Sequence, residues 1–232
     1  MNIALILSGG TGARMASDIP KQYIEVAGRP IISYCLRRLS GHGGIDSIQI
    51  VADPLWRTCI ENCLDGDDPA GKFRGFSRPG ENRQLSILYG LTDIRLYARD
   101  QDFVLVHDAA RPLLSDEMIS RCLDAAEGHD GVIPVLPMKD TVYRSEDGRT
   151  VSSLLNREKI FAGQAPEGFR LKAYYEANRR LLPDEIFKIN GSTEPAILAG
   201  MDVAMIVGDE NNFKITTKAD LERFQKMIGD SV

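Results

Sequence analysis

The sequence predicts an α/β protein with a Rossmann-like, mostly parallel sheet flanked by helices, from which one β-hairpin arm protrudes. Short apolar runs alternate with amphipathic stretches almost throughout the 232 residues, as expected where helices connect buried parallel strands. The first run, residues 3–7, leads straight into a glycine-rich turn. The alternation breaks once, near residues 141–155, where two strand-like segments follow each other without a helix.

The expected elements follow from local patterns. Apolar runs predict buried strands at residues 3–7, 47–52, 103–106, 131–135 and 203–207, and further strands are expected at residues 73–76 and 160–164. Apolar residues at helical spacing predict helices at residues 30–39, 56–64, 84–97, 116–127, 171–182 and 218–228. A chain of this length can form one domain, and we expect residues 1–232 to do so.

The interruption predicts an arm at about residues 138–157. Segments 141–144 and 150–155 are expected to pair as a hairpin through a turn at Asp147-Gly148. A two-stranded hairpin cannot hold a core of its own, so it must pack on something else. A second subunit is the natural candidate, which predicts a homodimer; the alternative is a hairpin lying flat on its own domain.

Charge and composition limit the partners. A charged fraction of 26% argues against disorder. The net charge of −5 gives no reason to expect nucleic acid binding, and any positive potential must be local, which suits a small anionic substrate in a cleft. No basic leader precedes the first strand and no apolar run is long enough to span a membrane, so we expect a cytoplasmic protein without a membrane partner.

The glycine-rich turn is a candidate phosphate site. Gly9, Gly10 and Gly12 let the backbone come close to a ligand and present its N–H groups to a phosphate. Arg14 and Lys21 add positive charge at fixed offsets, which suggests a nucleoside triphosphate. The loop fits neither the Walker motif nor the dinucleotide fingerprint, and the alternative is a tight connection only.

Two further segments belong with this turn. Asp108 follows a central strand, and ligands of open α/β sheets bind at the carboxyl ends of the strands. A carboxylate there can hold Mg²⁺ against the triphosphate, or it can simply cap the following turn. Gly80, Glu81, Arg83 and Ser86 form a turn into a helix, whose N–H groups and hydroxyl can contact a base edge; the alternative is an ordinary helix N-terminus.

Together these motifs resemble the cytidylyltransferases that make CDP-activated polyol phosphates. The resemblance rests on Gly9-Gly10-Thr11-Gly12-x-Arg14, Pro20-Lys21-Gln22-Tyr23, Gly80-Glu81-x-Arg83-x-x-Ser86, Val106-His107-Asp108-Ala109-Ala110-Arg111-Pro112, Asp140-Thr141 and Asn212-Phe213-Lys214-Ile215-Thr216-Thr217. It is strongest to the 2-C-methyl-D-erythritol 4-phosphate cytidylyltransferase family of the non-mevalonate isoprenoid pathway. The ribitol 5-phosphate cytidylyltransferases of cell-wall polymer synthesis are near relatives. The resemblance covers residues 3 to 224, and the His107–Pro112 run is its most specific part.

The resemblance implies an enzyme that joins CTP to a polyol phosphate with release of pyrophosphate and uses Mg²⁺. Methylerythritol phosphate is the leading acceptor, and ribitol 5-phosphate or another polyol phosphate is the alternative. A non-catalytic nucleotide-binding module is a further alternative. By resemblance the arm exchanges between two subunits and completes the acceptor site of the partner.

The resemblance also assigns residues. The implied catalytic cations are Arg14, Lys21 and Lys214. The implied nucleotide-binding residues are Ser8, Gly9, Gly10, Thr11, Gly12, Gly80, Glu81, Ser86, Asp108 and Ala109, with Asp108 also holding Mg²⁺. Thr141 and Arg157 are implied to bind the acceptor phosphate.

Three positions depart from the family pattern. Glu81 stands where the family commonly has Asp. Ala165 replaces the Thr of a Gln-Thr-Pro-Gln segment, which is here Gln164-Ala165-Pro166-Glu167. An ungapped match puts Asn190-Gly191 at a usual Thr-Asp pair, for which Thr193-Glu194 substitutes if the register shifts. The last two changes lie on the acceptor side and leave the CTP side nearly intact.

Overall fold

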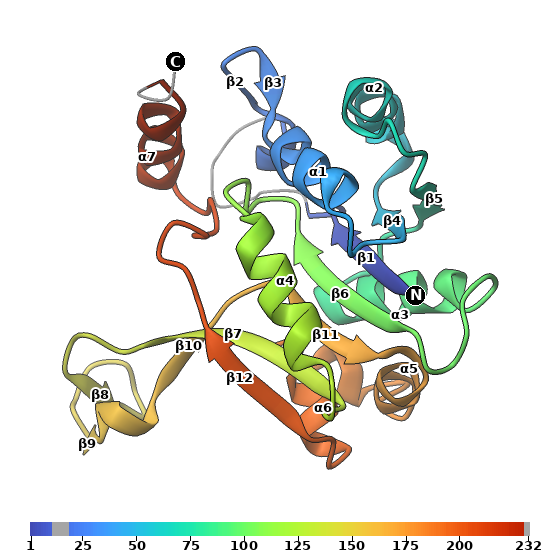
Figure 1. The fold of residues 1–232 in the computed structure, drawn as a ribbon. Helices are drawn as coiled ribbons and strands as arrows, with labels where there is room; N and C mark the ends of the chain where they lie inside the picture. Colours follow the sequence, from blue (N-terminus) through green and yellow to red (C-terminus); the bar gives the residue numbers. More distant parts are fainter. Residues whose placement is uncertain (11–18, 230–232) are drawn as a thin grey trace.

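An eight-stranded sheet forms the central layer of the computed structural model, which describes residues 1–10 and 19–229 (Figure 1). The strand order is β10-β7-β11-β6-β1-β4-β5. β12 lies off this path and pairs with the edge of β7 that is opposite β10 and β11. The strands are β1 (Asn2–Leu7), β4 (Ser47–Val51), β5 (Phe73–Ser77), β6 (Phe103–Asp108), β7 (Gly131–Pro137), β10 (Phe161–Gly163), β11 (Glu167–Arg170) and β12 (Val203–Val207). The predicted Rossmann-like, mostly parallel sheet is confirmed.

The strands at the centre of the sheet are parallel because helical crossovers connect them. β1 runs parallel to β4 and to β6, and β4 runs parallel to β5. The register pairs Leu7 with Asp108, so the last residues of β1 and β6 lie side by side at one edge of the sheet. That edge is where open α/β sheets bind ligands.

The sequence did not predict β11, which runs antiparallel between β6 and β7. Phe169 is the one large apolar residue in its four positions, so the segment lacks the apolar run of a buried strand. The antiparallel direction has a consequence for the site. Since β11 begins where β6 ends, Glu167 pairs with Val106 and lies near Asp108.

Helices cover both faces of the sheet. The helices are α1 (Ile31–Gly41), α2 (Arg57–Asp67), α3 (Arg83–Ile94), α4 (Asp116–Ala125), α5 (Leu171–Arg179), α6 (Glu194–Leu198) and α7 (Lys218–Gly229). One apolar cluster joins α1, α2 and α4 to one face, and another joins α3, α5 and α6 to the opposite face. β1 alternates between them, because Ile3 and Leu5 pack with α3 and α5 while Ala4 and Ile6 pack with α1. No helix in the described residues has an apolar stretch long enough to span a membrane.

Short elements complete the chain, and the apolar pattern did not predict α6. They are the 3₁₀ helices η2 (Lys21–Tyr23), η3 (Pro54–Trp56), η4 (Arg157–Lys159) and η5 (Glu185–Phe187), together with the paired strands β2 (Glu25–Val26) and β3 (Arg29–Pro30). The helices predicted at residues 84–97 and 171–182 end earlier, at Ile94 and Arg179. α7 packs its buried Phe224 against Ile31 of α1 and Ile215.

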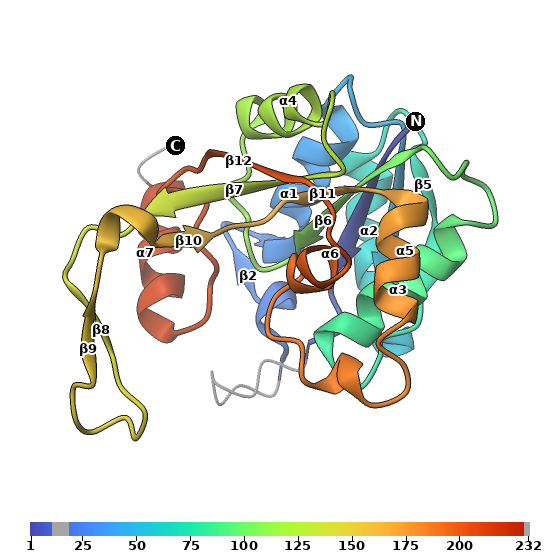
Figure 2. The ribbon, with the colours of Figure 1, turned by 90° about the horizontal axis from the view of Figure 1, so that it is seen from below.

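The hairpin arm projects away from the sheet in both views (Figures 1 and 2). Its strands, β8 (Val142–Arg144) and β9 (Ser153–Leu155), are shorter than predicted. Residues 145–152 connect them in place of a tight two-residue turn. The Asp147 carboxylate organises this connection by accepting hydrogen bonds from the backbone N–H groups of Arg149 and Thr150, each at 2.8 Å.

We predict that Gly168→Ala destabilises the fold by about 1–3 kcal/mol, because overpacking a core strains its neighbours. A Cβ at Gly168 would lie 2.4 Å from the ring of Phe103 and 2.9 Å from Val132. Gly66→Ala is the control, since a Cβ at this helical position meets nothing within 4 Å. Removing a helical glycine there stabilises by about 0.5–1 kcal/mol. Urea denaturation measures the free energy of unfolding of both variants. Equal urea midpoints for Gly168→Ala and Gly66→Ala would contradict the packing argument.

Candidate active site

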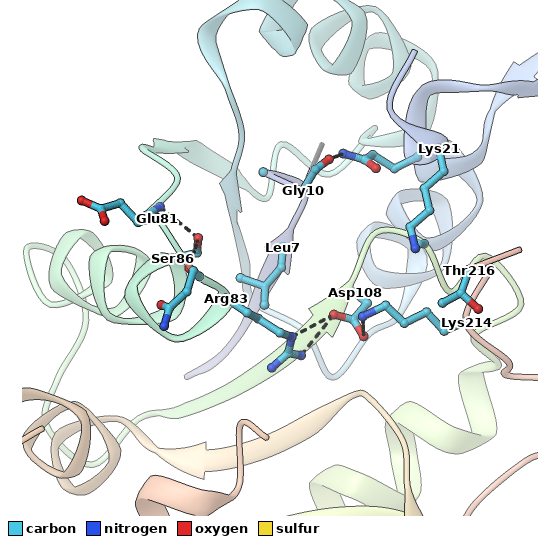
Figure 3. A pocket seen from close by; sticks show the side chains of 14 residues that line it. Leu7, Gly10, Lys21, Glu81, Arg83, Ser86, Asp108, Lys214 and Thr216 are labelled. Atoms are coloured by element: carbon cyan, nitrogen blue, oxygen red, sulfur yellow. Dashed lines mark hydrogen bonds and ion pairs between the residues drawn. The ribbon is translucent and has the colours of Figure 1, made fainter. Parts of the chain in front are cut away.

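A pocket of about 420 Å³ opens at the carboxyl ends of β1 and β6 (Figure 3). It is lined by Leu7, Gly9, Gly10, Lys21, Gln22, Gly80, Glu81, Asn82, Arg83, Ser86, Asp108, Ala110, Lys214 and Thr216. These residues come from five separate stretches of the chain, which the sheet topology brings to one edge. Most of the predicted nucleotide-side residues therefore meet in one place.

The described part of the glycine turn is fixed by close contacts. A Cβ at Gly9 would lie 2.6 Å from Cβ of Pro79, so only glycine fits there. A Cβ at Gly10 would meet nothing within 4 Å. The Gln22 side chain donates to the carbonyls of Ser8 at 2.8 Å and Gly10 at 2.9 Å, which ties the turn to η2. Thr11, Gly12 and Arg14 lie outside the described residues.

Lys21 enters the pocket from η2, directly after Pro20 (Figure 3). The next residues anchor it, because Tyr23 stacks on Trp56 with ring centroids 4.4 Å apart. The Tyr23 hydroxyl donates to the Ser8 carbonyl at 3.0 Å and lies 2.7 Å from the Ser8 hydroxyl. The Ser8 side chain is therefore buried against Tyr23 and does not line the pocket.

Asp108 lies at the centre of a cluster of cations. Its Oδ1 accepts from Arg83 Nη2 at 3.1 Å, and its Oδ2 accepts from Lys214 Nζ at 3.1 Å and from Arg111 Nε at 3.4 Å. Arg83 comes from the start of α3, Arg111 from the turn after β6, and Lys214 from the segment before α7. One carboxylate thus holds three cationic side chains from three parts of the chain.

Burial and these cations act in opposite directions on the carboxyl group. Burial alone raises the pKa of Asp108, but Arg83, Lys214 and Arg111 outweigh it and hold the pKa well below its ordinary value. Asp108 is therefore ionised over the whole physiological range. Removing it would leave three partly buried cations without a counter-charge, which is costly.

The turn before α3 is built from internal hydrogen bonds. The Ser86 hydroxyl accepts from the backbone N–H of Gly80 at 2.9 Å and donates to the carbonyl of Asn82 at 2.9 Å. Asn82 caps α3 by accepting from Leu85 N–H at 2.8 Å. The Ser86 hydroxyl thus holds the turn that lines the pocket. Glu81 is exposed and directed away from Asp108 (Figure 3).

The predicted acceptor residues lie elsewhere in the single chain. Thr141 and Arg157 share a separate hollow at the base of the arm with Leu154 and Leu155. Arg157 donates to the Lys139 carbonyl at 2.7 Å. The structure of one chain therefore does not bring Thr141 and Arg157 together with Lys21, Asp108 and Lys214. Ala109 is buried behind the pocket, and its neighbour Ala110 lines the wall.

Two of the residues around Asp108 were quoted only as parts of motifs. Arg83 and Arg111 both contact it, although the sequence placed Arg83 only in the candidate base-binding turn and gave Arg111 no function. Glu167 was also missed. It is buried and lies 3.9 Å from Arg83 Nη2. The signal for Arg83 was its place at a helix start beside a candidate base-binding turn, whereas nothing local marks Glu167.

Glu167 binds the segment that follows Asn190-Gly191, one of the departures on the acceptor side. Its carboxylate accepts from the Ser192 hydroxyl at 2.9 Å and the Thr193 hydroxyl at 2.6 Å. Ser192 also contacts Arg83 closely. Burial raises the pKa of Glu167 more than Arg83, Thr193 and Ser192 lower it. Ser192 and Thr193, rather than Asn190-Gly191, therefore face the β11 segment.

The donor set fits a cation carried by a triphosphate. The described residues contain no group of three or more His, Cys, Asp or Glu side chains placed to hold a metal. Asp108 is the lining carboxylate that faces the cations, whereas Glu81 points away. Mg²⁺ is commonly bound by one or two carboxylates together with phosphate oxygens and waters. A single carboxylate at this edge is compatible with that coordination.

A mostly parallel sheet with a glycine turn and cationic side chains at the carboxyl ends of its strands places the chain in the Rossmann-like α/β class. Within this class, the chain can be assigned to one family. The family model described as IspD, 2-C-methyl-D-erythritol 4-phosphate cytidylyltransferase, matches residues 2–230, and the chain belongs to this family of nucleotidyltransferases. The resemblance inferred from the motifs is thereby confirmed.

Individual relatives support the same family assignment. The chain is 36% identical over 223 residues to a 2-C-methyl-D-erythritol 4-phosphate cytidylyltransferase of Nitrosomonas eutropha, covering 95% of this chain and 93% of that protein. It is 36% identical to a bifunctional enzyme IspD/IspF of Granulibacter bethesdensis, of which it spans 57%, while 99% of this chain is covered. A crystal structure of 4-diphosphocytidyl-2C-methyl-D-erythritol synthase from Anaerococcus prevotii superposes with a TM-score of 0.84 at 28% identity, covering 98% of this chain and 96% of that one.

His107 braces the turn that carries Arg111. Its ring is fully buried, and Nε2 donates to the Arg111 carbonyl at 3.1 Å, since a carbonyl can only accept. Nδ1 is then unprotonated, and it has no hydrogen-bond partner among the described residues. Burial lowers the pKa of His107 from 6.5 to about 4. The folded protein therefore holds a neutral imidazole at neutral pH.

We predict a pH-dependent stability that traces to His107. Between the unfolded pKa of 6.5 and the folded pKa of about 4, the unfolded chain binds a proton that the folded chain does not. The free energy of unfolding therefore falls as the pH drops through this window, by up to about 3 kcal/mol, and the contribution is complete above the unfolded pKa. His107→Gln keeps a donor for Arg111 but does not titrate. Urea titrations of both proteins measure the difference, and parallel pH profiles would show that His107 is not responsible.

Proposed function

We propose that this chain transfers CMP from CTP to 2-C-methyl-D-erythritol 4-phosphate and releases pyrophosphate, as a step of non-mevalonate isoprenoid biosynthesis. The observation that carries the proposal is the convergence of Lys21, Arg83 and Lys214 around Asp108, in a pocket beside the glycine turn. Family membership over residues 2–230 supplies the substrates. The names of the relatives favour methylerythritol phosphate over ribitol 5-phosphate.

The chemistry needs positioning and charge more than covalent participation by the protein. An oxygen of the acceptor phosphate attacks the α-phosphorus of CTP in line, and pyrophosphate leaves from the opposite side. Lys21 and Lys214 enter the pocket from different elements, so they can neutralise phosphate oxygens from two directions (Figure 3). We assign Arg14 to the same task by family resemblance. Gly9 and Gly10 line the same space.

The turn at Gly80–Ser86 is assigned to the cytosine base. Gly80 is closely packed, because a Cβ there would lie 2.4 Å from Cβ of Leu85. The hydrogen bonds of Ser86 hold this backbone in one conformation, so its polar groups are fixed before a base arrives. A preorganised turn loses little freedom when the nucleotide binds.

Mg²⁺ is proposed to enter with the triphosphate. Asp108 would hold it through one carboxylate oxygen, and the remaining ligands would come from phosphate oxygens and water. When bound, the ion would supply further neutralisation of phosphate charge. Lys214 Nζ contacts Oδ2 of Asp108. In the proposal, the ammonium group exchanges this contact for one with a phosphate oxygen.

The arm is proposed to complete the acceptor site of a second subunit. Tyr143, Val151 and Leu154 are 58%, 66% and 66% exposed, which is unusual for apolar side chains on a short hairpin and favours burial against a partner. Arg157 lies at the base of this arm and is exposed. Its planar fork suits a phosphate, which it can grip by two hydrogen bonds.

We predict that the protein releases pyrophosphate when CTP, Mg²⁺ and methylerythritol phosphate are all present, and that chelation of Mg²⁺ stops the reaction. Lys214→Met should lower kcat/KM on the order of 10²–10³, because it removes one cation that stabilises the transition state. Lys218→Met is the matched control, since Lys218 is exposed at the start of α7 and does not line the pocket.

A coupled pyrophosphate assay measures each reaction. Preference for ribitol 5-phosphate would keep the class of reaction and change the acceptor. If no polyol phosphate leads to pyrophosphate release but calorimetry detects CTP binding, the protein would instead be a nucleotide-binding module without catalysis.

We predict that two inactive variants restore each other when they are co-expressed. If the arm serves the partner, a heterodimer of Lys214→Met and Arg157→Ala has one site with both defects and one site with none. Random pairing then recovers about a quarter of the wild-type activity. Thr141→Ala with Arg157→Ala is the control, since each subunit then donates a defective arm. No recovery in the first pair, or a monomer in light scattering, would contradict exchange of the arm.

A further inference from the structure

Gln164 follows β10 directly, and its side chain is buried. It makes two hydrogen bonds with the backbone of Asp209: Oε1 accepts from the N–H at 2.9 Å, and Nε2 donates to the carbonyl at 2.9 Å. A neighbouring strand would make the same pair of bonds. The side chain thus binds the backbone just beyond the point where β12 ends, since Gly208 N–H still bonds Val135 of β7 at 2.8 Å.

A second amide reaches back in the opposite direction. Asn212 is fully buried, and its Nδ2 donates to the carbonyl of Ala165 at 2.6 Å. Gln164 and Asn212 therefore bind each other's backbone segments, and we call these contacts the amide clasp. The clasp joins residues 164–165 to residues 209–212, about 45 positions apart in the sequence.

Lys214 comes two residues after this clasp. The carbonyl of Asn212 accepts from Arg111 Nη1 at 2.7 Å, and the N–H of Ile215 donates to the carbonyl of Ala110 at 2.9 Å. Between these two points, the Lys214 side chain reaches Asp108 at 3.1 Å. The clasp therefore fixes one end of the short segment from which Lys214 enters the pocket.

The far end of the segment is fixed by the start of α7. Asp220 accepts from the backbone N–H groups of Thr216 at 2.8 Å and Thr217 at 2.7 Å. With both ends held, the backbone at Lys214 has little freedom. Releasing one end would let the ammonium group move relative to Asp108 and to any bound phosphate.

Gly208 leaves room for the clasp. A Cβ at this position would lie 2.4 Å from Oε1 of Gln164 and 3.0 Å from the carbonyl of Val135. The second contact is with backbone, which cannot move aside easily. Gly208→Ala therefore offers a way to displace the Gln164 amide without changing Gln164 itself.

We propose that Gln164 is a positioning residue that acts through Lys214. Gln164 does not line the pocket, so it reaches the reaction only through the segment it holds. The inference rests on the proposed function, in which Lys214 contacts the phosphates. A merely structural Gln164 would contribute stability but would not couple to Lys214 in particular.

A double-mutant cycle separates these two cases. Gln164→Met keeps the length of the side chain but removes both hydrogen bonds to Asp209. Alone it should lower kcat/KM about 10- to 100-fold, since a displacement on the order of 1 Å of a positioned group costs this much. In the Lys214→Met background the same change should lower kcat/KM less than about two-fold, because residues that act as a unit are not additive.

Gln49→Met is the matched control. Gln49 is equally buried in β4 and donates to the Ser77 hydroxyl at 3.0 Å, away from residues 209–214. Its effect on kcat/KM should be the same with Lys214 and with Met at that position. A Gln164 effect that likewise multiplies in both backgrounds would overturn the proposal.

Hydrogen exchange tests the clasp without activity. Gln164→Met and Gly208→Ala should both raise amide exchange across residues 209–215, whereas Gln49→Met should not. Unchanged exchange in both clasp variants would refute the clasp even if the enzyme is active. Absence of transferase activity in the wild-type protein, with raised exchange in the variants, would refute the proposed function and the link to catalysis while leaving the anchoring of the segment supported.

Discussion

The buried negative charge of Asp108 is the constraint on which the rest of the site depends. A carboxylate with so little exposure is stable only if cations and donors surround it, and here Arg83, Arg111 and Lys214 do so. These cations come from the start of α3, the turn after β6 and the segment before α7. Asp108 therefore holds three otherwise distant parts of the chain at one edge of the sheet.

The topology explains why this convergence occurs at that edge. Parallel pairing of β1 and β6 puts Leu7 opposite Asp108, so the glycine turn and the carboxylate emerge together. The antiparallel β11 begins where β6 ends and delivers Glu167 to the same region. Glu167 then holds the hydroxyls of Ser192 and Thr193, so the segment before α6 is tied to Arg83. The ends of β1 and β6 thus line the pocket directly, and Glu167 at the start of β11 contacts the lining residue Arg83.

The sequence predicted the parts of this arrangement that have local signals. Apolar runs located the parallel strands, and the position of Asp108 at a strand end placed it beside the glycine turn. The apolar pattern did not predict β11 or α6, because the first has one large apolar side chain and the second has five residues. The contacts of Arg83 and Lys214 with Asp108 span 25 and 106 positions, so no local pattern reveals them. Lys214 was assigned through family resemblance alone, and the hydroxyl contacts of Glu167 required the fold.

The charge balance of the site shows how an acidic protein can attract a highly anionic substrate. The chain carries a net charge of −5. Around the pocket, however, Lys21, Arg83, Arg111 and Lys214 outnumber the buried carboxylates Asp108 and Glu167. Burial raises the pKa of Glu167, whereas Asp108 stays ionised because it touches three cations. The local excess of positive charge is therefore kept in place by one anion that is too well surrounded to protonate. That anion orients the cations in advance, so the site needs little rearrangement when phosphate oxygens arrive.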